Sequence, residues 1–144
     1  MRVAEITTVT PAVREAMRRL LPQLSARSAP PDEAALERIV GAPTVRLLFA
    51  VDGEGAYVGM LSLVLTPLPT GLRARIEDVV VDASERGHGA GTMLVTDAIR
   101  RAWAAGARDI DLTARPAHPG AVGLYTSLGF APRETGVYRL ARDG

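Results

Sequence analysis

The sequence predicts one α/β domain built around a mixed, mostly antiparallel sheet. Its 144 residues suffice for one hydrophobic core but not for two independent cores, so we expect a single domain over residues 1–144. Hydrophobic residues make up 47% and charged residues 23% of the chain, which is typical of a globular protein. Segments with strand periodicity alternate with segments of helical periodicity, and hairpin-like strands precede a strand–turn–helix–strand unit.

The first third of the chain predicts a short strand and two helices. Residues 4–8 have strand character, and Pro11 suits the first position of a helix that continues through residue 21. After a loop at residues 25–31, Asp32 can cap a second helix, which Gly41 ends. The first helix carries apolar residues at helical spacing, namely Val13, Met17, Leu20, Leu21 and Leu24.

Three strands are predicted next. Residues 45–51 and 56–66 are rich in β-branched and apolar residues, and the sequence Asp-Gly-Glu-Gly between them has hairpin-turn chemistry. Residues 67–71 break the chain before a third strand at residues 72–81. Three consecutive valines end that strand and predict burial on both faces, so we expect it to be the central strand.

The remaining chain predicts two helices and two strands. Apolar spacing from Met93 to Ala102 indicates a helix that ends near Gly106, followed by a strand at residues 110–113. Residues 119–128 have helical character and are closed by Gly129. Residues 135–140 predict a terminal strand.

Composition argues against several kinds of function. With 17 basic and 16 acidic residues the net charge is +1, so nothing global directs the chain to nucleic acid or to an anionic membrane. The absence of cysteine excludes disulfides, a thiol nucleophile and cysteine-based metal sites, and with only two histidines we predict no metal. The N-terminus lacks the apolar core of a signal peptide and no apolar run could span a bilayer, so we expect a cytoplasmic protein.

The sequence Arg-Gly-His-Gly-Ala-Gly at residues 86–91 has the chemistry of an anion site. It lies between a predicted strand and a helix, where unpaired backbone N–H groups and the helix dipole favour a bound anion. Gly87, Gly89 and Gly91 would let the backbone approach phosphate oxygens without Cβ obstruction, and Arg86 could reach the same oxygens. The alternative is an ordinary turn, but three alternating glycines beside an arginine favour a pyrophosphate site.

This segment resembles the cofactor loop of the GNAT superfamily of acyl-CoA-dependent N-acetyltransferases. That loop reads Gln or Arg, two residues, Gly, one residue, then Gly or Ala, and Arg86, Gly89 and Gly91 match it. The resemblance extends back through Ile-Glu-Asp-Val-Val-Val-Asp at residues 76–82 and forward to Gly-Leu-Tyr-Thr-Ser-Leu-Gly-Phe at residues 123–130. Because the order of elements is similar too, the resemblance covers nearly the whole chain.

The resemblance implies a fold and a cosubstrate. The implied GNAT fold is a central mixed, mostly antiparallel sheet of about six to seven strands with four helices, splayed at the central parallel strands. The implied cosubstrate is acetyl-CoA, with its pyrophosphate on the glycine loop and its pantetheine arm along the central strand. The cofactor-binding residues implied are Val79, Val80, Val81, Arg86, Gly87, His88, Gly89, Ala90, Gly91 and Thr92.

In such enzymes a free amine attacks the acetyl carbonyl, so the protein must help to deprotonate an ammonium whose pKa is roughly 10. We predict Glu77 as the base, because it would share a strand face with Val79 and Val81 and because a glutamate here is similar to the base of many relatives. Asp78 would point to the opposite face unless a bulge intervenes. Asp78 or a water chain stays open as an alternative base. Glu77 itself could instead be an ordinary carboxylate paired with an arginine. The resemblance implies Tyr125 as the general acid that protonates the leaving thiolate.

Two rival motifs fit less well, and one rival function stays open. Glycines at 87, 89 and 91 do not give the G-x-G-x-x-G spacing of a dinucleotide-binding oxidoreductase, and a chain without lysine has no Walker motif. A non-catalytic acyl-CoA-binding sensor on the same fold stays open, because a fold does not guarantee activity.

No motif in the sequence identifies the acceptor. We expect its pocket among the first two helices, residues 67–71 and the C-terminal strands, and expect a small-molecule or peptide amine. A small molecule is slightly favoured over a protein amine. An amino sugar phosphate is one candidate, because residues 77–82 look similar to glucosamine phosphate N-acetyltransferases and Arg73, Arg75 or Arg115 could bind a phosphate. Protein N-termini, polyamines, amino acids and aminoglycosides stay open. His118 stands where many relatives have a cofactor-contacting asparagine, which leaves its role open. By analogy with relatives that pair through C-terminal strands, the chain could form a homodimer.

Overall fold

The computed structural model describes residues 1–27, 29–114 and 119–142. The chain divides into two units, Met1–Thr113 and Ala114–Gly144. The expectation of one domain over the whole chain stays a prediction.

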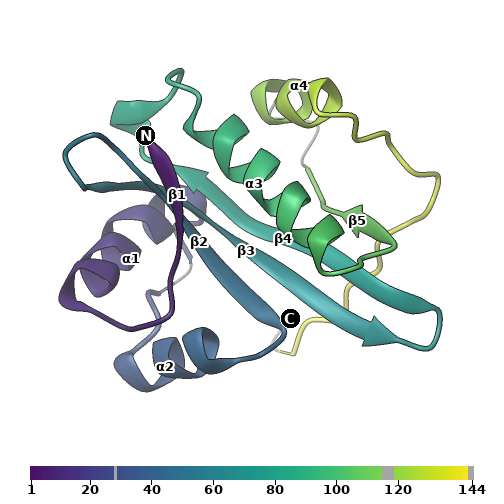
Figure 1. Ribbon diagram of the computed structural model, residues 1–144, viewed down its shortest axis with the longest axis horizontal. Coiled ribbons are helices and arrows are strands. Elements are labelled where there is room, and N and C mark those ends of the chain that lie inside the picture. The colour runs from purple at the N-terminus through teal and green to yellow at the C-terminus, as the bar shows by residue number, and fades with distance from the viewer. Residues whose placement is uncertain (28, 115–118, 143–144) are drawn as a thin grey trace. The chain divides into compact units, whose positions relative to one another are not determined.

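Five strands form one sheet in the first unit (Figure 1). They keep their chain order across the sheet, and every neighbouring pair is antiparallel except β4 and β5, which are parallel. The predicted mixed, mostly antiparallel sheet is therefore confirmed. The predicted count of six to seven strands is wrong, because the described residues form five. The strands are β1 (Arg2–Glu5), β2 (Val45–Val51), β3 (Tyr57–Leu68), β4 (Gly71–Val81) and β5 (Asp109–Asp111).

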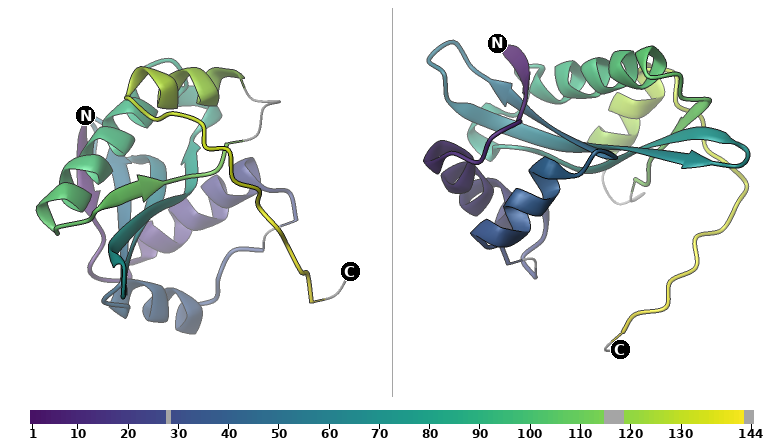
Figure 2. Two further views of the ribbon diagram at one scale, coloured as in Figure 1. Left: turned by 90° about the vertical axis from the view of Figure 1, so that its right-hand side faces the viewer. Right: turned by 60° about the horizontal axis from the view of Figure 1, so that its bottom comes forward.

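Three helices of this unit lie on the two faces of the sheet. Helices α1 (Pro11–Leu24) and α2 (Glu33–Gly41) cover one face, and α3 (Ala90–Ala104) covers the other (Figure 2). As predicted, α1 begins with a proline and Asp32 caps α2, accepting a hydrogen bond of 2.8 Å from the N–H of Ala35. No helix in the described ranges is both long and apolar enough to cross a bilayer.

Alternation along the strands separates two layers of core. Leu47 and Phe49 of β2 join Leu20 and Leu36 of the helices on the α1 and α2 face, while Leu48 between them points toward the α3 face. On that second face α3 buries residues at helical spacing, which are Leu94, Val95, Ala98 and Ala102. The sheet is therefore buried on both sides. The expectation that β4 is the central strand is wrong, because β4 lies next to the edge strand β5, and of its three terminal valines only Val80 is buried.

The parallel pair β4–β5 is short and leaves most of β4 without a strand on that side. Only residues 73–75 of β4 pair with β5, and an ion pair between Arg73 Nη1 and Asp109 Oδ2, 3.1 Å apart, joins the two strands there. Beyond Arg75, no strand within the described part of this unit lies against β4 on the β5 side. This is the splay that the resemblance implied.

The described residues of the second unit form one helix, α4 (Pro119–Ser127), followed by a tail without helix or strand. Gly129 follows the helix with φ of 97°, and the N–H of Phe130 donates to the carbonyl of Tyr125 at 3.0 Å, as expected for a glycine-terminated helix. The terminal strand predicted at residues 135–140 is wrong, because these residues form no strand. Its apolar side chains are exposed, with 96% of Tyr138 and 99% of Leu140 accessible.

Candidate active site

The glycine loop begins where β4 ends. A short 3-10 turn, η1 (Ala83–Glu85), leads into Arg86, and Gly87 and Gly89 take φ values of 86° and 83°. L-residues rarely adopt these left-handed values, so glycine is needed at both positions for the chain to turn into α3. No atom lies within 4 Å of where a Cβ would stand on either glycine, so the backbone is open to an approaching ligand.

The first turn of α3 has the donors that an anion needs. Gly89 is the N-cap and offers no side-chain acceptor, so the N–H groups of Ala90, Gly91 and Thr92 begin the helix without a cap. Arg86 is exposed and has no hydrogen bond or ion pair to another described residue, whereas His88 Nδ1 lies 3.2 Å from Glu85 Oε2. Open glycines, uncapped amides and an uncommitted guanidinium fit a pyrophosphate.

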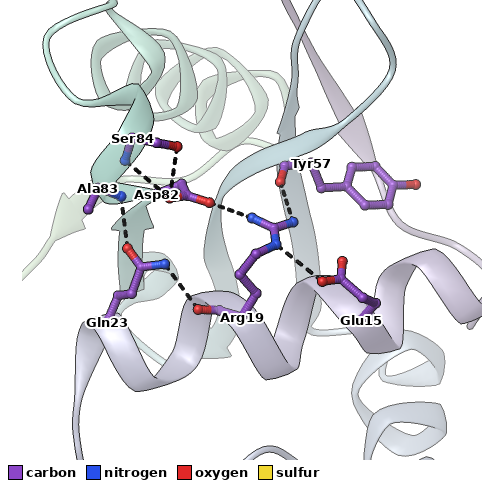
Figure 3. A network of polar contacts seen from close by, with 7 residues as sticks. All are labelled: Glu15, Arg19, Gln23, Tyr57, Asp82, Ala83 and Ser84. Carbon is purple, nitrogen blue, oxygen red and sulfur yellow. Dashed lines mark hydrogen bonds and ion pairs between the residues drawn. The ribbon is translucent and has the colours of Figure 1, made fainter.

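A polar network ties α1 to the chain that leads into this loop (Figure 3). Arg19 of α1 donates to Asp82 Oδ2 at 2.6 Å and to the carbonyl oxygen of Tyr57 at 2.8 Å. Gln23 accepts from the N–H of Ala83 at 2.8 Å, and Asp82 accepts from the N–H of Ser84 at 3.2 Å. The network therefore fixes the end of β4 and the start of η1. The sequence analysis missed Arg19, because nothing local distinguishes it from its neighbour Arg18.

Strand β4 bulges at Asp78. On the antiparallel neighbour β3, Ser62 opposes Glu77 and Met60 opposes Val80, so Asp78 and Val79 together face one residue, Leu61. Asp78 has φ of 55°, a left-handed value that aspartate tolerates better than most residues other than glycine. From the sequence, Asp78 could share the face of Glu77 only if a bulge intervened. That bulge is present.

The bulge places both carboxylates on the face that α1 and α2 cover. Residues directly opposed in an antiparallel pair point to the same face, so Glu77 shares the face of Ser62. Asp78 lines a pocket together with Ser62, so it lies on this face too. The expectation that Glu77 shares its face with Val81 is wrong, because it assumed regular alternation. Val81 opposes Gly59, on the other face.

The two carboxylates differ in their surroundings. Glu77 Oε1 accepts two hydrogen bonds from Arg75, from Nε at 3.0 Å and from Nη2 at 2.9 Å, so it is the Arg-paired carboxylate left open by the sequence. Asp78 has no hydrogen bond from a described residue, and partial burial raises its pKa, with the negative charge of Glu77 adding to the rise. The pKa of Asp78 is thus shifted in the direction that favours its protonated carboxyl.

The pocket beside Asp78 has a volume of about 260 Å³ and lies between the helices and the sheet. Two of its lining residues are polar, Ser62 and Asp78. The helices contribute Met17, Leu21, Leu24 and Ile39. The segment between the helices contributes Ala29 and Pro31, and the sheet contributes Leu47 and Met60. Most of the lining side chains are therefore apolar, with a single ionisable group among them.

Tyr125 lies in the second unit, on α4. It is half-buried and packs against Phe130 with ring centroids 6.0 Å apart and planes at 69°. Burial raises the pKa of its phenol, which therefore keeps its proton at neutral pH.

The other predicted site residues lie in the first unit, or outside the described residues. Val79 and Val81 are half-buried and Val80 is buried, on the stretch of β4 beyond its pairing with β5. His118 and Arg115 lie outside the described residues. Within the described ranges, no three or more Cys, His, Asp or Glu side chains are grouped so that they could hold a metal ion.

Comparison with known proteins gives one family. A model of the acetyltransferase (GNAT) family matches residues 11–130. Among curated proteins, no sequence matches the chain.

Several solved structures have the same fold. A transcriptional regulator from Bacillus halodurans C-125 is 28% identical with a TM-score of 0.81, covering 97% of this chain and 100% of its own. An aminoglycoside acetyltransferase from an uncultured soil metagenomic sample, in complex with trehalose, is 18% identical with a TM-score of 0.83, covering 97% and 94%. The enzyme AAC(6')-Iy, in complex with a CoA-containing bisubstrate analogue, is 20% identical with a TM-score of 0.77, covering 97% of each chain.

Proposed function

Because this chain belongs to the acetyltransferase (GNAT) family, we propose that it transfers an acetyl group from acetyl-CoA to a primary amine of a small molecule. Acetyltransferases of this family use acetyl-CoA, and two structural relatives are aminoglycoside acetyltransferases. The chain is accordingly an acyltransferase, and the amine acceptor and the residues that act on it are our proposal.

The main support is that the features needed to bind the two substrates lie together along one short stretch of β4. Beyond Arg75 its backbone has no strand neighbour on the β5 side, and at its end the chain enters the loop with the open glycines and uncapped α3 amides. In between, Asp78 reaches the apolar pocket on the α1 and α2 face. Arg86, Gly87, His88, Gly89 and the first turn of α3 would bind the pyrophosphate, and residues 79–81 would hold the pantetheine arm.

We assign Asp78 as the proton acceptor. When bound, acetyl-CoA supplies an acetyl thioester that the amine nitrogen can attack. Asp78 takes a proton from the incoming ammonium, and the new C–N bond forms as the C–S bond breaks. A raised pKa suits this task, since a base works best when its pKa lies closer to the working pH. Glu77, predicted as the base from the sequence, supports this role through its negative charge beside Asp78.

Tyr125 is the proposed proton donor to the departing CoA thiolate. Its raised pKa keeps the phenol protonated until the thiolate forms, and the proton then restores the free thiol of CoA. The second proton, which the nitrogen loses as it becomes an amide, returns to the phenolate, and Asp78 releases the first proton to solvent. A water chain that brings the ammonium proton to Asp78 is compatible with the same balance.

The test compares Asp78→Asn with Glu77→Gln in an assay of released CoA. Because the chain has no cysteine, a thiol reagent measures CoA without a protein background. A general base contributes about 10²–10⁴-fold, so kcat should fall at least about 100-fold in Asp78→Asn and less than tenfold in Glu77→Gln. The reverse order would return the role to Glu77. Binding of acetyl-CoA without any release of CoA would support the sensor alternative.

A further inference from the structure

We propose that the acceptor is a small amine on an apolar body, about the size of one aromatic ring or a branched alkyl chain, bound in the pocket beside Asp78. This inference rests on the proposed function and adds the chemical class of its acceptor.

The wall of the pocket selects an apolar body. The side chains of Leu21 and Leu24 of α1, Ile39 of α2 and Met60 of β3 are hydrocarbon or thioether, while the rest of the lining also includes polar atoms. The hydroxyls of an aminoglycoside or a sugar would lose water there and find one hydroxyl partner, Ser62, in the lining. Transfer of a hydrocarbon surface from water to such a lining is favourable in free energy.

The volume of the pocket limits the part of the acceptor that it can enclose, because the pocket is half open to solvent. Apolar cavities of about 150 Å³ accommodate benzene, so about 260 Å³ has room for one ring with a short aliphatic arm. Pockets for drug-sized ligands have volumes of roughly 300–1,000 Å³, so this one is small for a compound of several rings.

Charge in and near the pocket selects a cation without an anionic group. Asp78 is the only ionisable lining residue among those described, and the second carboxylate on this face, Glu77, is partly compensated by Arg75. An ammonium is attracted by these carboxylates, whereas a phosphate or carboxylate on the acceptor is repelled.

The arginines nearest in sequence are already paired. Arg75 donates to Glu77, and Arg73 pairs with Asp109 and donates to Thr70. Neither lines the pocket. The structure therefore gives no support from these two arginines to the amino sugar phosphate that was one candidate from the sequence.

The experiment measures CoA release with matched pairs of acceptors. The panel contains 2-phenylethylamine and phenylalanine, isoamylamine and leucine, glucosamine 6-phosphate and neamine. We expect kcat/KM for each apolar amine to exceed that of its carboxylate-bearing partner and of both sugar amines by at least about tenfold, since small differences in an apolar pocket are worth about 10–200-fold.

Two variants locate the acceptor. Leu24→Gln changes the rim of the pocket at a residue that is 38% exposed, and Leu68→Gln makes the same change at an exposed position that does not line it. Leu24→Gln should raise KM for 2-phenylethylamine at least about threefold, leave KM for acetyl-CoA unchanged and leave the urea midpoint close to that of Leu68→Gln. Equal KM for 2-phenylethylamine in the two variants would overturn the assignment of the pocket.

The outcomes separate this inference from the function beneath it. Faster acetylation of glucosamine 6-phosphate or neamine than of both apolar amines would overturn the acceptor class and leave the acetyltransferase proposal standing. Binding of acetyl-CoA with acetylation of no amine in the panel would overturn both.

Discussion

Arg19→Met is the variant that most directly tests whether α1 holds the start of the cofactor loop in place. Methionine keeps an unbranched stem and the helix propensity of the side chain but removes every donor. The variant loses the hydrogen bonds to Asp82 at 2.6 Å and to the Tyr57 carbonyl at 2.8 Å, and a longer contact of 3.3 Å with Glu15. Asp82, whose side chain is only 17% exposed, is left without its cation.

The expected loss of stability follows from these contacts. A hydrogen bond between charged groups contributes about 1.5–3 kcal/mol and a bond to a neutral carbonyl about 1 kcal/mol. The Arg19 side chain is 34% exposed, so water screens part of this, and the Glu15 contact adds little. We expect a loss of about 2–3 kcal/mol in the free energy of unfolding, or roughly 4–12 °C in Tm.

The assay is urea unfolding followed by circular dichroism, with Arg14→Met as the matched control on the same helix. Among the described residues Arg14 pairs only with Glu33, whose side chain is 68% exposed, so its loss should cost no more than about 0.5–1 kcal/mol. Arg19→Met should also raise KM for acetyl-CoA, which Arg14→Met should not. Equal unfolding free energies for the two variants would refute the reasoning.

The pH dependence supplies an internal check. The N–H of Ser84 and then Arg19 lower the pKa of Asp82. The stability from this carboxylate is therefore present above its unfolded pKa of about 3.9 and is lost as pH falls through the lower folded value. The difference in the free energy of unfolding between the parent and Arg19→Met should be largest at neutral pH and should decrease below about pH 4. A difference that grew with acid would contradict the ion pair.

Three further predictions concern the reaction itself. Tyr125→Phe should lower kcat about 100-fold or more while calorimetry finds the Kd of acetyl-CoA unchanged, and an unchanged rate would remove Tyr125 from the catalytic residues. Gly89→Val puts a β-branched residue at φ of 83° and fills the open face of the loop, so acetyl-CoA should bind at least about tenfold more weakly; an unchanged Kd would contradict the phosphate site. Because the pKa of Asp78 is raised and the base acts when deprotonated, kcat should rise with pH through that value, and Asp78→Asn should lose this limb; a limb that persisted in the variant would belong to another group.

Stability and function are opposed at Asp78. A carboxyl whose folded pKa is raised stabilises the fold below its unfolded pKa, and that contribution is lost as pH rises through the folded value. Asparagine carries no charge and tolerates a φ of 55°. Asp78→Asn should therefore be at least as stable as the parent at neutral pH, which separates loss of activity from loss of fold.

Much of the fold could be predicted because its signals are local. The strand at residues 45–51 has the predicted bounds, and Asp32 caps α2 as expected. The predicted strand at residues 135–140 is wrong for the opposite reason. Its pattern of apolar residues satisfies the local rule, but a strand also needs a hydrogen-bonded neighbour, which local sequence does not specify.

The site could be predicted where a single segment builds it. The positive φ values in the loop could be predicted from its glycines, since only glycine adopts such values readily. The bulge depends on how β4 registers against β3, so the sequence could name it only as a condition. The apolar stripe of α1 was predicted, but which of its residues are core and which line a pocket depends on the position of α2. Leu20 is fully buried in the core, whereas Leu21 faces the pocket.

Calorimetric titration with acetyl-CoA tests the central claim most directly, with NADH and ATP as controls. The parent protein should bind acetyl-CoA saturably and in preference to both controls. Arg86→Met should weaken this binding about tenfold or more, because it removes an exposed guanidinium with no other described partner. No binding of acetyl-CoA, or a preference for NADH, would contradict the account.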